Sequence, residues 1–309
     1  MKKLYLNAIF QLSVILIIIG LFLFEGLDIE KLKFIFKTET AFLLIYLVLL
    51  KLLIAFLFFA IINLVTEKKN YFNEIASTFL QGGIVNQLLP SAGLFFKYYK
   101  FKHIYNVSLA QYSSSQLILS LSSLLSYMIV AVIFGFLTII SFNLEIFFYL
   151  IISLILFIVI TILIKDKLYL YVKKTLLKIN HILNIINEFI KIKNLVLDKK
   201  NKIFFIMLGF LLLAILECFS FYWIVYILEV NISFIKAIFL YVSTSLLTVL
   251  FLVNFIGLFE IILVLSASLI LSNYLDMIYA GLGFKVLNTF ALIVTIALLE
   301  LISVFKKDS

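Results

Sequence analysis

The chain has 309 residues, of which 65% are hydrophobic and 13% charged, and its mean hydropathy is +1.24. Soluble domains are about half apolar and about a quarter charged, so this composition excludes an ordinary soluble fold. Without the two-residue alternation of a membrane barrel, it predicts an all-α polytopic membrane protein. The net charge of +9 does not indicate a nucleic-acid partner, because the lysines lie in short loops that set membrane topology.

A helix needs about 20 apolar residues to cross a bilayer. We therefore expect about eight transmembrane helices in a single membrane domain, residues 1–309. The first follows Lys2-Lys3 and has no small-residue cleavage pattern, so we expect it to stay in the protein. The predicted spans are 4–24, 41–65, 111–138, 146–164, 203–228, 236–255, 258–272 and 278–304.

Residues 72–96 are apolar but contain a polar, glycine-flanked break around Pro90, the only proline of the chain. Proline removes a backbone donor and clashes with the preceding helical turn. Broken backbone survives in hydrocarbon only where protein or a water-filled cavity covers it, and transporters place such breaks at binding sites. We predict a re-entrant segment here, with Pro90 near its turn or on its returning limb.

Lysine counts orient the predicted spans. Residues 165–202 contain ten lysines, whereas 139–145 contain none. The positive-inside rule then places 165–202 and both termini in the cytoplasm, with the protein in the cytoplasmic (inner or plasma) membrane. The lysines within 66–70 and 97–102 are cytoplasmic as well only if 72–96 enters the membrane and returns on the same side.

The basic segment 165–202 links a first half, 1–164, to a second half, 203–309. Its apolar residues are spaced by three and four, which predicts an amphipathic helix. That helix either lies on anionic headgroups or packs against the ends of the spans. The two halves are a possible pseudo-repeat, because Gly93-Leu94-Phe95 recurs as Gly257-Leu258-Phe259. The apolar stripe is Val172, Leu176, Ile179, Leu183, Ile186 and Ile190.

Charged residues inside spans are informative, because each costs at least about 2.5–3.5 kcal/mol near the bilayer centre. Lys51 and Glu217 are equally compatible with an ion pair and with a functional role. Lys97, Glu260 and Lys285 adjoin glycine-containing breaks, and we predict that they bind substrate, since an ammonium group can hold a phosphate. The other candidate lipid-binding residues are Asn86, Gln87, Pro90, Ser91, Gly93, Gly257 and Asn288.

Motifs of soluble enzymes and metal sites are lacking. His103 and His181 are the only histidines and Cys218 is the only cysteine, so we expect no metal site, no cofactor and no intrachain disulfide. A serine-rich stretch within 111–138 favours close helix packing over nucleophilic attack. Its serines are Ser113, Ser114, Ser115, Ser120, Ser122, Ser123 and Ser126.

Three collinear motifs resemble the lysylphosphatidylglycerol synthase transmembrane (flippase-like) family. The run 86–93 with Lys97 is similar to its Asn/Pro/Gly/basic signature, 257–260 to a glycine segment ending in Glu, and 283–288 to a last-span motif that usually has arginine where Lys285 stands. The chain departs from the family at Ser115-Gln116, where an acidic-basic pair is common. Members include the flippase portion of multiple peptide resistance factor, implicated in moving aminoacylated phospholipid between leaflets. Because this chain ends at Ser309, we expect it to lack the soluble synthase domain.

We therefore predict a flippase-like protein that handles or translocates an anionic lipid, a polyprenyl-phosphate-linked lipid or an aminoacylated phospholipid, with membrane lipids as its partners. Two alternatives remain open. One is a membrane-embedded transferase acting on a lipid phosphate, with Glu260 or Glu217 as its base. The other is a non-catalytic scaffold that docks a cytoplasmic or membrane enzyme of a lipid or glycolipid pathway through 165–202.

Overall fold

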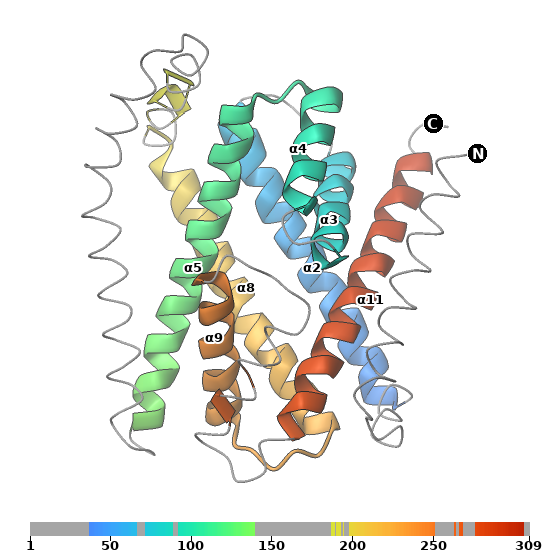
Figure 1. Cartoon of the computed structure of the whole chain (residues 1–309), viewed down its shortest axis with the longest axis vertical. Helices are drawn as coiled ribbons and strands as arrows, with labels where there is room; N and C mark the ends of the chain where they lie inside the picture. The colour runs from blue at the N-terminus through green and yellow to red at the C-terminus, as the bar shows by residue number, and fades with distance from the viewer. Residues whose placement is uncertain are drawn as a thin grey trace.

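The computed structural model describes residues 37–66, 72–88, 92–139, 187–188, 190–192, 194, 198–250, 263, 266–267 and 276–305. Within these ranges the chain forms helices and no strand, as the composition predicts (Figure 1). The helices are α2 (Thr38–Thr66), α3 (Phe72–Leu88), α4 (Ala92–Tyr105), α5 (Leu109–Ile139), α8 (Lys200–Ile227), α9 (Phe234–Leu250) and α11 (Asp276–Phe305).

Four described helices, α2, α5, α8 and α11, are long and apolar enough to cross a membrane. They lie at the predicted spans 41–65, 111–138, 203–228 and 278–304. Helix α9 is a shorter apolar helix at the place of the predicted span 236–255. The predicted spans 4–24, 146–164 and 258–272 lie outside the described residues, so the total of about eight stays a prediction.

Helix α5 has the inside-out pattern of a helix that faces lipid. Large apolar side chains such as Leu117, Leu121 and Phe136 are exposed, whereas the buried face carries small hydroxyls. In a membrane, small residues at helix interfaces let the backbones approach closely. The buried serines are Ser114, Ser115, Ser122 and Ser126. Their burial fits the packing role predicted for this stretch.

Helix α2 is the hub of the bundle, because it packs against α3, α5, α8 and α11. Helix α9 packs against α5 and α8, whereas α3 packs against α2 and α11. Figure 1 places the start of α5, the start of α8 and the end of α11 at one end of the molecule, drawn uppermost. The start of α2, the end of α8 and the start of α11 lie at the opposite, lower end.

The connection from α4 to α5 is specified by local sequence. Asn106 adopts a positive φ of 51°, which asparagine tolerates better than most residues. Ser108 then begins α5 with a capping box: its Oγ accepts from the backbone N–H of Gln111, 3.2 Å away, and Gln111 Oε1 accepts from the N–H of Ser108, 3.0 Å away. These reciprocal bonds satisfy two backbone donors and set where α5 starts.

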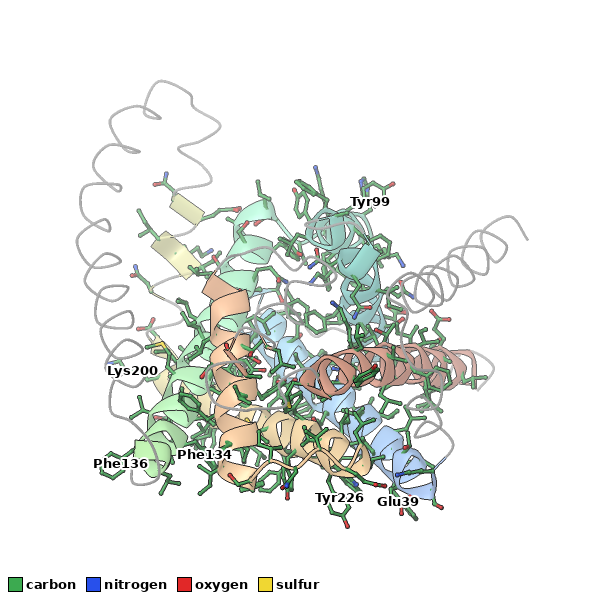
Figure 2. The ribbon with its side chains drawn as sticks, turned by 60° about the horizontal axis from the view of Figure 1, so that its bottom comes forward. Glu39, Tyr99, Phe134, Phe136, Lys200 and Tyr226 are labelled. Carbon is green, nitrogen blue, oxygen red and sulfur yellow. The ribbon has the colours of Figure 1, made fainter. Side chains whose placement is uncertain are left out.

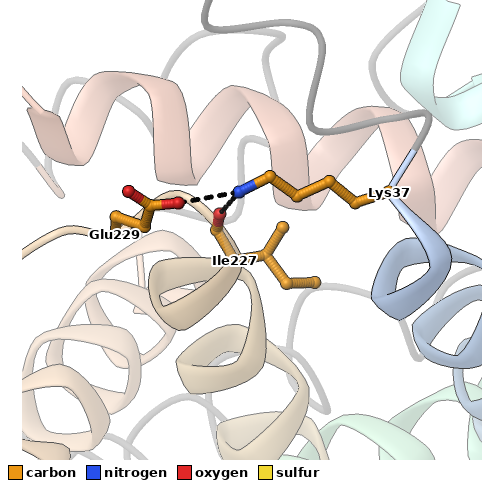
Figure 3. Close-up of polar contacts among 3 residues, drawn as sticks. All are labelled: Lys37, Ile227 and Glu229. Carbon is orange, nitrogen blue, oxygen red and sulfur yellow. Dashed lines mark hydrogen bonds and ion pairs between the residues drawn. The ribbon is translucent and has the colours of Figure 1, made fainter.

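The lower end of α8 is closed by a Schellman-type turn. The N–H of Val230 donates to the Val225 carbonyl, and Glu229 occupies the left-handed position with φ of 59°. Lys37 Nζ donates to the carbonyl of Ile227 at 3.0 Å and pairs with Glu229 Oε1 at 2.9 Å (Figure 3). A cation here satisfies a terminal carbonyl and complements the helix dipole. This contact ties the start of α2 to the end of α8.

The segment 165–202 is described only from residue 187 onward. There Ile190, the last residue of the predicted apolar stripe, is exposed, while Ile192 is buried in the main core. Glu188 accepts a hydrogen bond from Ser108 Oγ at 2.8 Å. This end of the segment therefore contacts the start of α5, and the rest of the predicted amphipathic helix lies outside the described residues.

Candidate functional site

The predicted break at Pro90 separates two helices. Helix α3 ends at Leu88 and α4 begins at Ala92, on either side of residues 89–91, which include Pro90 and Ser91 and lie outside the described residues. The two helices pack against each other and reach from the upper end of the bundle to about half-way along it (Figure 1). Their 17 and 14 residues correspond to about 26 and 21 Å, less than the roughly 30 Å of a hydrocarbon core.

Two glycines allow this hairpin to close. A Cβ on Gly93 would lie 2.1 Å from the carbonyl oxygen of Gly82 and 2.7 Å from Cβ of Asn86. A Cβ on Gly82 would lie 2.2 Å from Cγ of Lys97, so the aliphatic stem of that lysine crosses the glycine. The predicted candidates Asn86, Gly93 and Lys97 are therefore in one packed interface.

Aromatic rings anchor the hairpin to the rest of the bundle. The buried ring of Phe58 on α2 stacks on Phe79 of α3, with 4.3 Å between centroids, and lies 5.7 Å from Phe101 of α4. Phe101 in turn stacks on Tyr112 of α5 at 5.9 Å. Such ring pairs contribute about 0.5–1.5 kcal/mol each beyond the area that they bury. The hairpin is thus fixed to α2 and α5 at its middle.

Helix α4 has one buried face and one exposed face, and Lys97 lies on the buried one. Gly93, Lys97 and Phe101, spaced four residues apart, form the buried face. Phe95 and Tyr99 are exposed on the opposite face, and Figure 2 shows Tyr99 pointing away from the bundle. The Lys97 side chain is only 8% exposed, so it points into the bundle.

The Lys97 ammonium has a ring as its described neighbour and no carboxylate. Its Nζ lies 4.8 Å from the centroid of Phe79, a cation–π contact. Among the described residues, no acidic group lies within ion-pair distance of it. Close by in the same interface, Oδ1 of Asn86 is buried and has no hydrogen-bond partner in the described part of the chain. The ammonium group of Lys97 and Oδ1 of Asn86 can therefore each form a further contact with a polar ligand.

Helix α11 supplies the third side of this site. Oγ1 of Thr289 donates to Oε1 of Gln87 at 3.1 Å, which joins the end of α3 to the first half of α11. Lys285 lies one turn before Thr289 and is partly buried, and its carbonyl accepts a second contact from the same threonine hydroxyl. Asn288 Nδ2 donates to the carbonyl of Phe284 at 2.9 Å. The predicted residues of α11 thus adjoin the hairpin.

A polar relay links the hairpin to α11 nearer the upper end. Lys100 Nζ donates to Oε1 of Gln81 at 2.7 Å, and Nε2 of Gln81 donates to Oε1 of Glu300 at 2.7 Å. The amide therefore bridges a basic and an acidic residue from two different helices. This relay gives the three helices a defined register, which positions Lys97 between them.

The two charges without a motif, Lys51 and Glu217, come together elsewhere. Lys51 on α2 lies within electrostatic reach of Glu217 on α8, and Oε2 of Glu217 accepts a hydrogen bond from the hydroxyl of Tyr127 on α5. This cluster belongs to the α2–α5–α8 part of the bundle and is not part of the hairpin site. Gly257 and Glu260 lie outside the described residues, so their predicted roles stay predictions.

Sequence reasoning missed several polar residues of these sites. Thr289 directly follows the predicted Asn288, and Gln81 directly precedes Gly82-Gly83, so proximity to a motif was the available signal. Tyr127 had no such signal, because its partner is 90 residues away in the chain.

Comparison of the chain with protein-family models, curated proteins and solved structures finds no match. The resemblance to the flippase-like family therefore stays a prediction.

Proposed function

We propose that this chain is a flippase-like membrane protein that handles an anionic or polyprenyl-phosphate-linked lipid, or an aminoacylated phospholipid, at the α3–α4 hairpin. The observation that carries the proposal is Lys97, a buried ammonium without a described carboxylate partner. An isolated buried charge is strongly unfavourable unless a counter-charge accompanies it. A lipid phosphate, abundant around a helical membrane protein, is the counter-charge that this position fits.

The neighbouring residues supply the remaining contacts in this proposal. Lys97 attracts the phosphate, and the orphaned Oδ1 of Asn86 accepts from a headgroup hydroxyl or amine. Gln87 and Asn288 flank the same region, and Lys285 adds a second positive charge. The roles of Pro90, Gly257 and Glu260 follow from the sequence alone.

Charge distribution supports an orientation for the hairpin. The upper end of the bundle, where α4 ends and α8 starts, is lysine-rich, which by the positive-inside rule is the cytoplasmic side (Figure 1). The hairpin then enters from the cytoplasm and ends near the bilayer centre. A lipid headgroup that moves along the hairpin would reach the middle of the membrane in contact with the protein. It would not have to enter the hydrocarbon alone. The lysines concerned are Lys100, Lys102, Lys199, Lys200 and Lys202.

The direct test is lipid movement by the purified full chain in liposomes. Fluorescent phosphatidylglycerol or a fluorescent polyprenyl phosphate is placed in one leaflet, and its appearance in the other is followed by a membrane-impermeant quencher. Lys97→Met keeps an unbranched side chain over Gly82 but removes the charge. We expect this variant to lose at least about tenfold in rate, the equivalent of about 1.4 kcal/mol in barrier height.

The matched control is Lys102→Met, because Lys102 is an exposed lysine on the same helix. We expect it to retain the wild-type rate. Equal rates for wild type and Lys97→Met would overturn the proposal. Turnover of a soluble donor by the wild-type protein, with no lipid movement, would replace it with the transferase alternative.

A further inference from the structure

A second cluster of titratable side chains lies between the two predicted halves of the chain. Lys51 and Tyr127 come from α2 and α5 of the first half, and Glu217 and Tyr241 come from α8 and α9 of the second. All four are within the long apolar helices or their partner α9. No motif predicts this cluster, and the proposed lipid site does not use it.

Hydrogen bonds connect the hydroxyl groups of the cluster to one carboxylate. The Tyr127 hydroxyl donates to Oε2 of Glu217. The Tyr241 hydroxyl is hydrogen-bonded to Tyr127 and Ser245, and the two tyrosine rings lie 6.5 Å apart between centroids. The chain of hydroxyls thus runs from α9 through α5 to the carboxylate on α8. Hydroxyl groups both donate and accept, so such a chain can pass a proton along its length.

The groups around Glu217 balance its charge. From α2, Lys51 attracts the carboxylate, and the Tyr46 hydroxyl donates to the carbonyl of the adjacent Leu216 at 2.9 Å. From α8 itself, the thiol of Cys218 is the neighbouring titratable group. Tyr127 and Tyr241 face the carboxylate from α5 and α9.

From α11, the apolar ring of Phe284 packs on Tyr241 and on Phe221 of α8. The charged residue that follows this ring in the sequence is Lys285, which adjoins the hairpin site. The described groups nearest to the Glu217 carboxylate are therefore one cation, a set of tyrosine hydroxyls and a thiol. Lys51, Tyr127 and Glu217 are each only partly buried.

We propose that Glu217 is a proton-binding site. Its carboxylate accepts one proton from water, directly or through the Tyr241–Tyr127 hydroxyls, and becomes a neutral carboxylic acid. In the ionised form, Lys51 and the Tyr127 hydroxyl stabilise the carboxylate. In the protonated form, the attraction between α2 and α8 is lost and Lys51 remains as the only charge of the pair. One proton thus switches an attraction that joins the two halves.

The use of this site to drive lipid movement rests on the proposed function, but proton binding does not. Infrared difference spectra of the full chain in lipid, recorded across a series of pH steps, measure proton binding through the C=O band of a protonated carboxylic acid. We expect Glu217→Gln to remove one such band. Glu229→Gln, which changes an exposed glutamate at the lower end of α8, is the matched control and should retain that band.

Two further variants test the partners. Lys51→Met should shift the midpoint of the Glu217 band to higher pH by about one pH unit or more, because an adjacent cation favours the ionised form. Tyr127→Phe should shift it in the same direction, since it removes a donor to the carboxylate. A wild-type spectrum in Glu217→Gln, or an unchanged midpoint in both partner variants, would overturn the proposal.

Lipid movement under an imposed pH gradient separates the two proposals. A rate that responds to the gradient in wild type but not in Glu217→Gln supports the use of the proton in transport. If the Glu217 band titrates but wild-type protein moves no lipid, the proton site stands and the proposed function fails.

Discussion

Two lysines inside the helical bundle differ in what surrounds them. Lys51 lies within electrostatic reach of Glu217 on a neighbouring helix, so the protein places a carboxylate near its charge. Lys97 is more completely buried, crosses a glycine and faces an aromatic ring, with no described carboxylate beside it. A lysine with an internal counter-charge contributes to the fold or to proton binding, whereas one without it is suited to an external anion.

The largest expected effect comes from forcing apart the two helices of the hairpin at their closest contact. Gly93→Ala places a methyl group 2.1 Å from a backbone carbonyl of α3, so the two helices must separate. We expect a loss of about 3 kcal/mol in unfolding free energy, at the upper end of overpacking effects. Gly83→Ala is the control, because its methyl group would meet Leu292 at an ordinary 3.6 Å. Denaturant unfolding in detergent micelles measures both, and equal losses would contradict the close packing.

Replacing Lys51, the lysine near Glu217, should cause the next largest loss of stability. Lys51→Met leaves the Glu217 carboxylate without its cation, and we expect a loss of about 1–3 kcal/mol, less than for a fully buried pair. Adding Glu217→Gln should restore part of that loss, since the double variant leaves no charge unpaired. A double-mutant cycle of unfolding free energies gives the coupling directly. Strictly additive losses would show that the two charges do not interact.

Replacing Lys97, the lysine without a described carboxylate beside it, should raise stability instead of lowering it. Lys97→Met removes a buried charge that lacks a described partner, so we expect a gain of about 1 kcal/mol in unfolding free energy together with the loss of lipid movement. A variant that is more stable and less active is the signature of a residue kept for a ligand. Destabilisation as large as that of Lys51→Met would instead indicate an internal counter-charge. Unfolding and flipping assays on the same preparation measure both quantities.

Replacing the exposed Lys37 should have the smallest effect on stability, and it serves as the baseline for the other lysines. Lys37 is 42% exposed and pairs with a Glu229 that is 82% exposed. Exposed pairs contribute about 0–1 kcal/mol, so Lys37→Met should cost less than about 1 kcal/mol, and high salt should reduce that cost further. Unfolding measured at low and high salt tests this expectation. A loss of several kcal/mol in unfolding free energy that does not depend on salt would show that the hydrogen bond to the Ile227 carbonyl stabilises the protein more than the geometry indicates.

Much of the helical framework could be predicted from the sequence. Hydropathy alone placed α2, α5, α8 and α11 with ends within about three residues of the observed ones, because the bilayer requires long apolar runs. The break after Leu88 followed from Pro90 and its glycine and amide neighbours. Helix α4, however, continues to Tyr105, beyond the end of the predicted segment at 96. Its lysines indicated a loop, but the helix continues and packs against α3.

The geometry of the sites was less predictable. The inward direction of Lys97 depends on the rotation of α4 about its axis, which Gly93 and Phe101 determine through contacts with other helices. The pairing of Tyr127 with Glu217 depends on how two distant helices cross. Neither property is encoded in local spacing, because α4 carries aromatic rings on both its buried and its exposed face and the sequence of α8 shows little difference between its faces.

The tight connection between α4 and α5 constrains how the protein can move. Three residues and the reciprocal Ser108–Gln111 bonds leave little freedom between these helices, and the Phe101–Tyr112 stack adds a second attachment. The end of α4 and the start of α5 are therefore held in a fixed position relative to each other. A cross-link between the end of α4 and the start of α5 should therefore disturb the protein little, because these two ends are already held together.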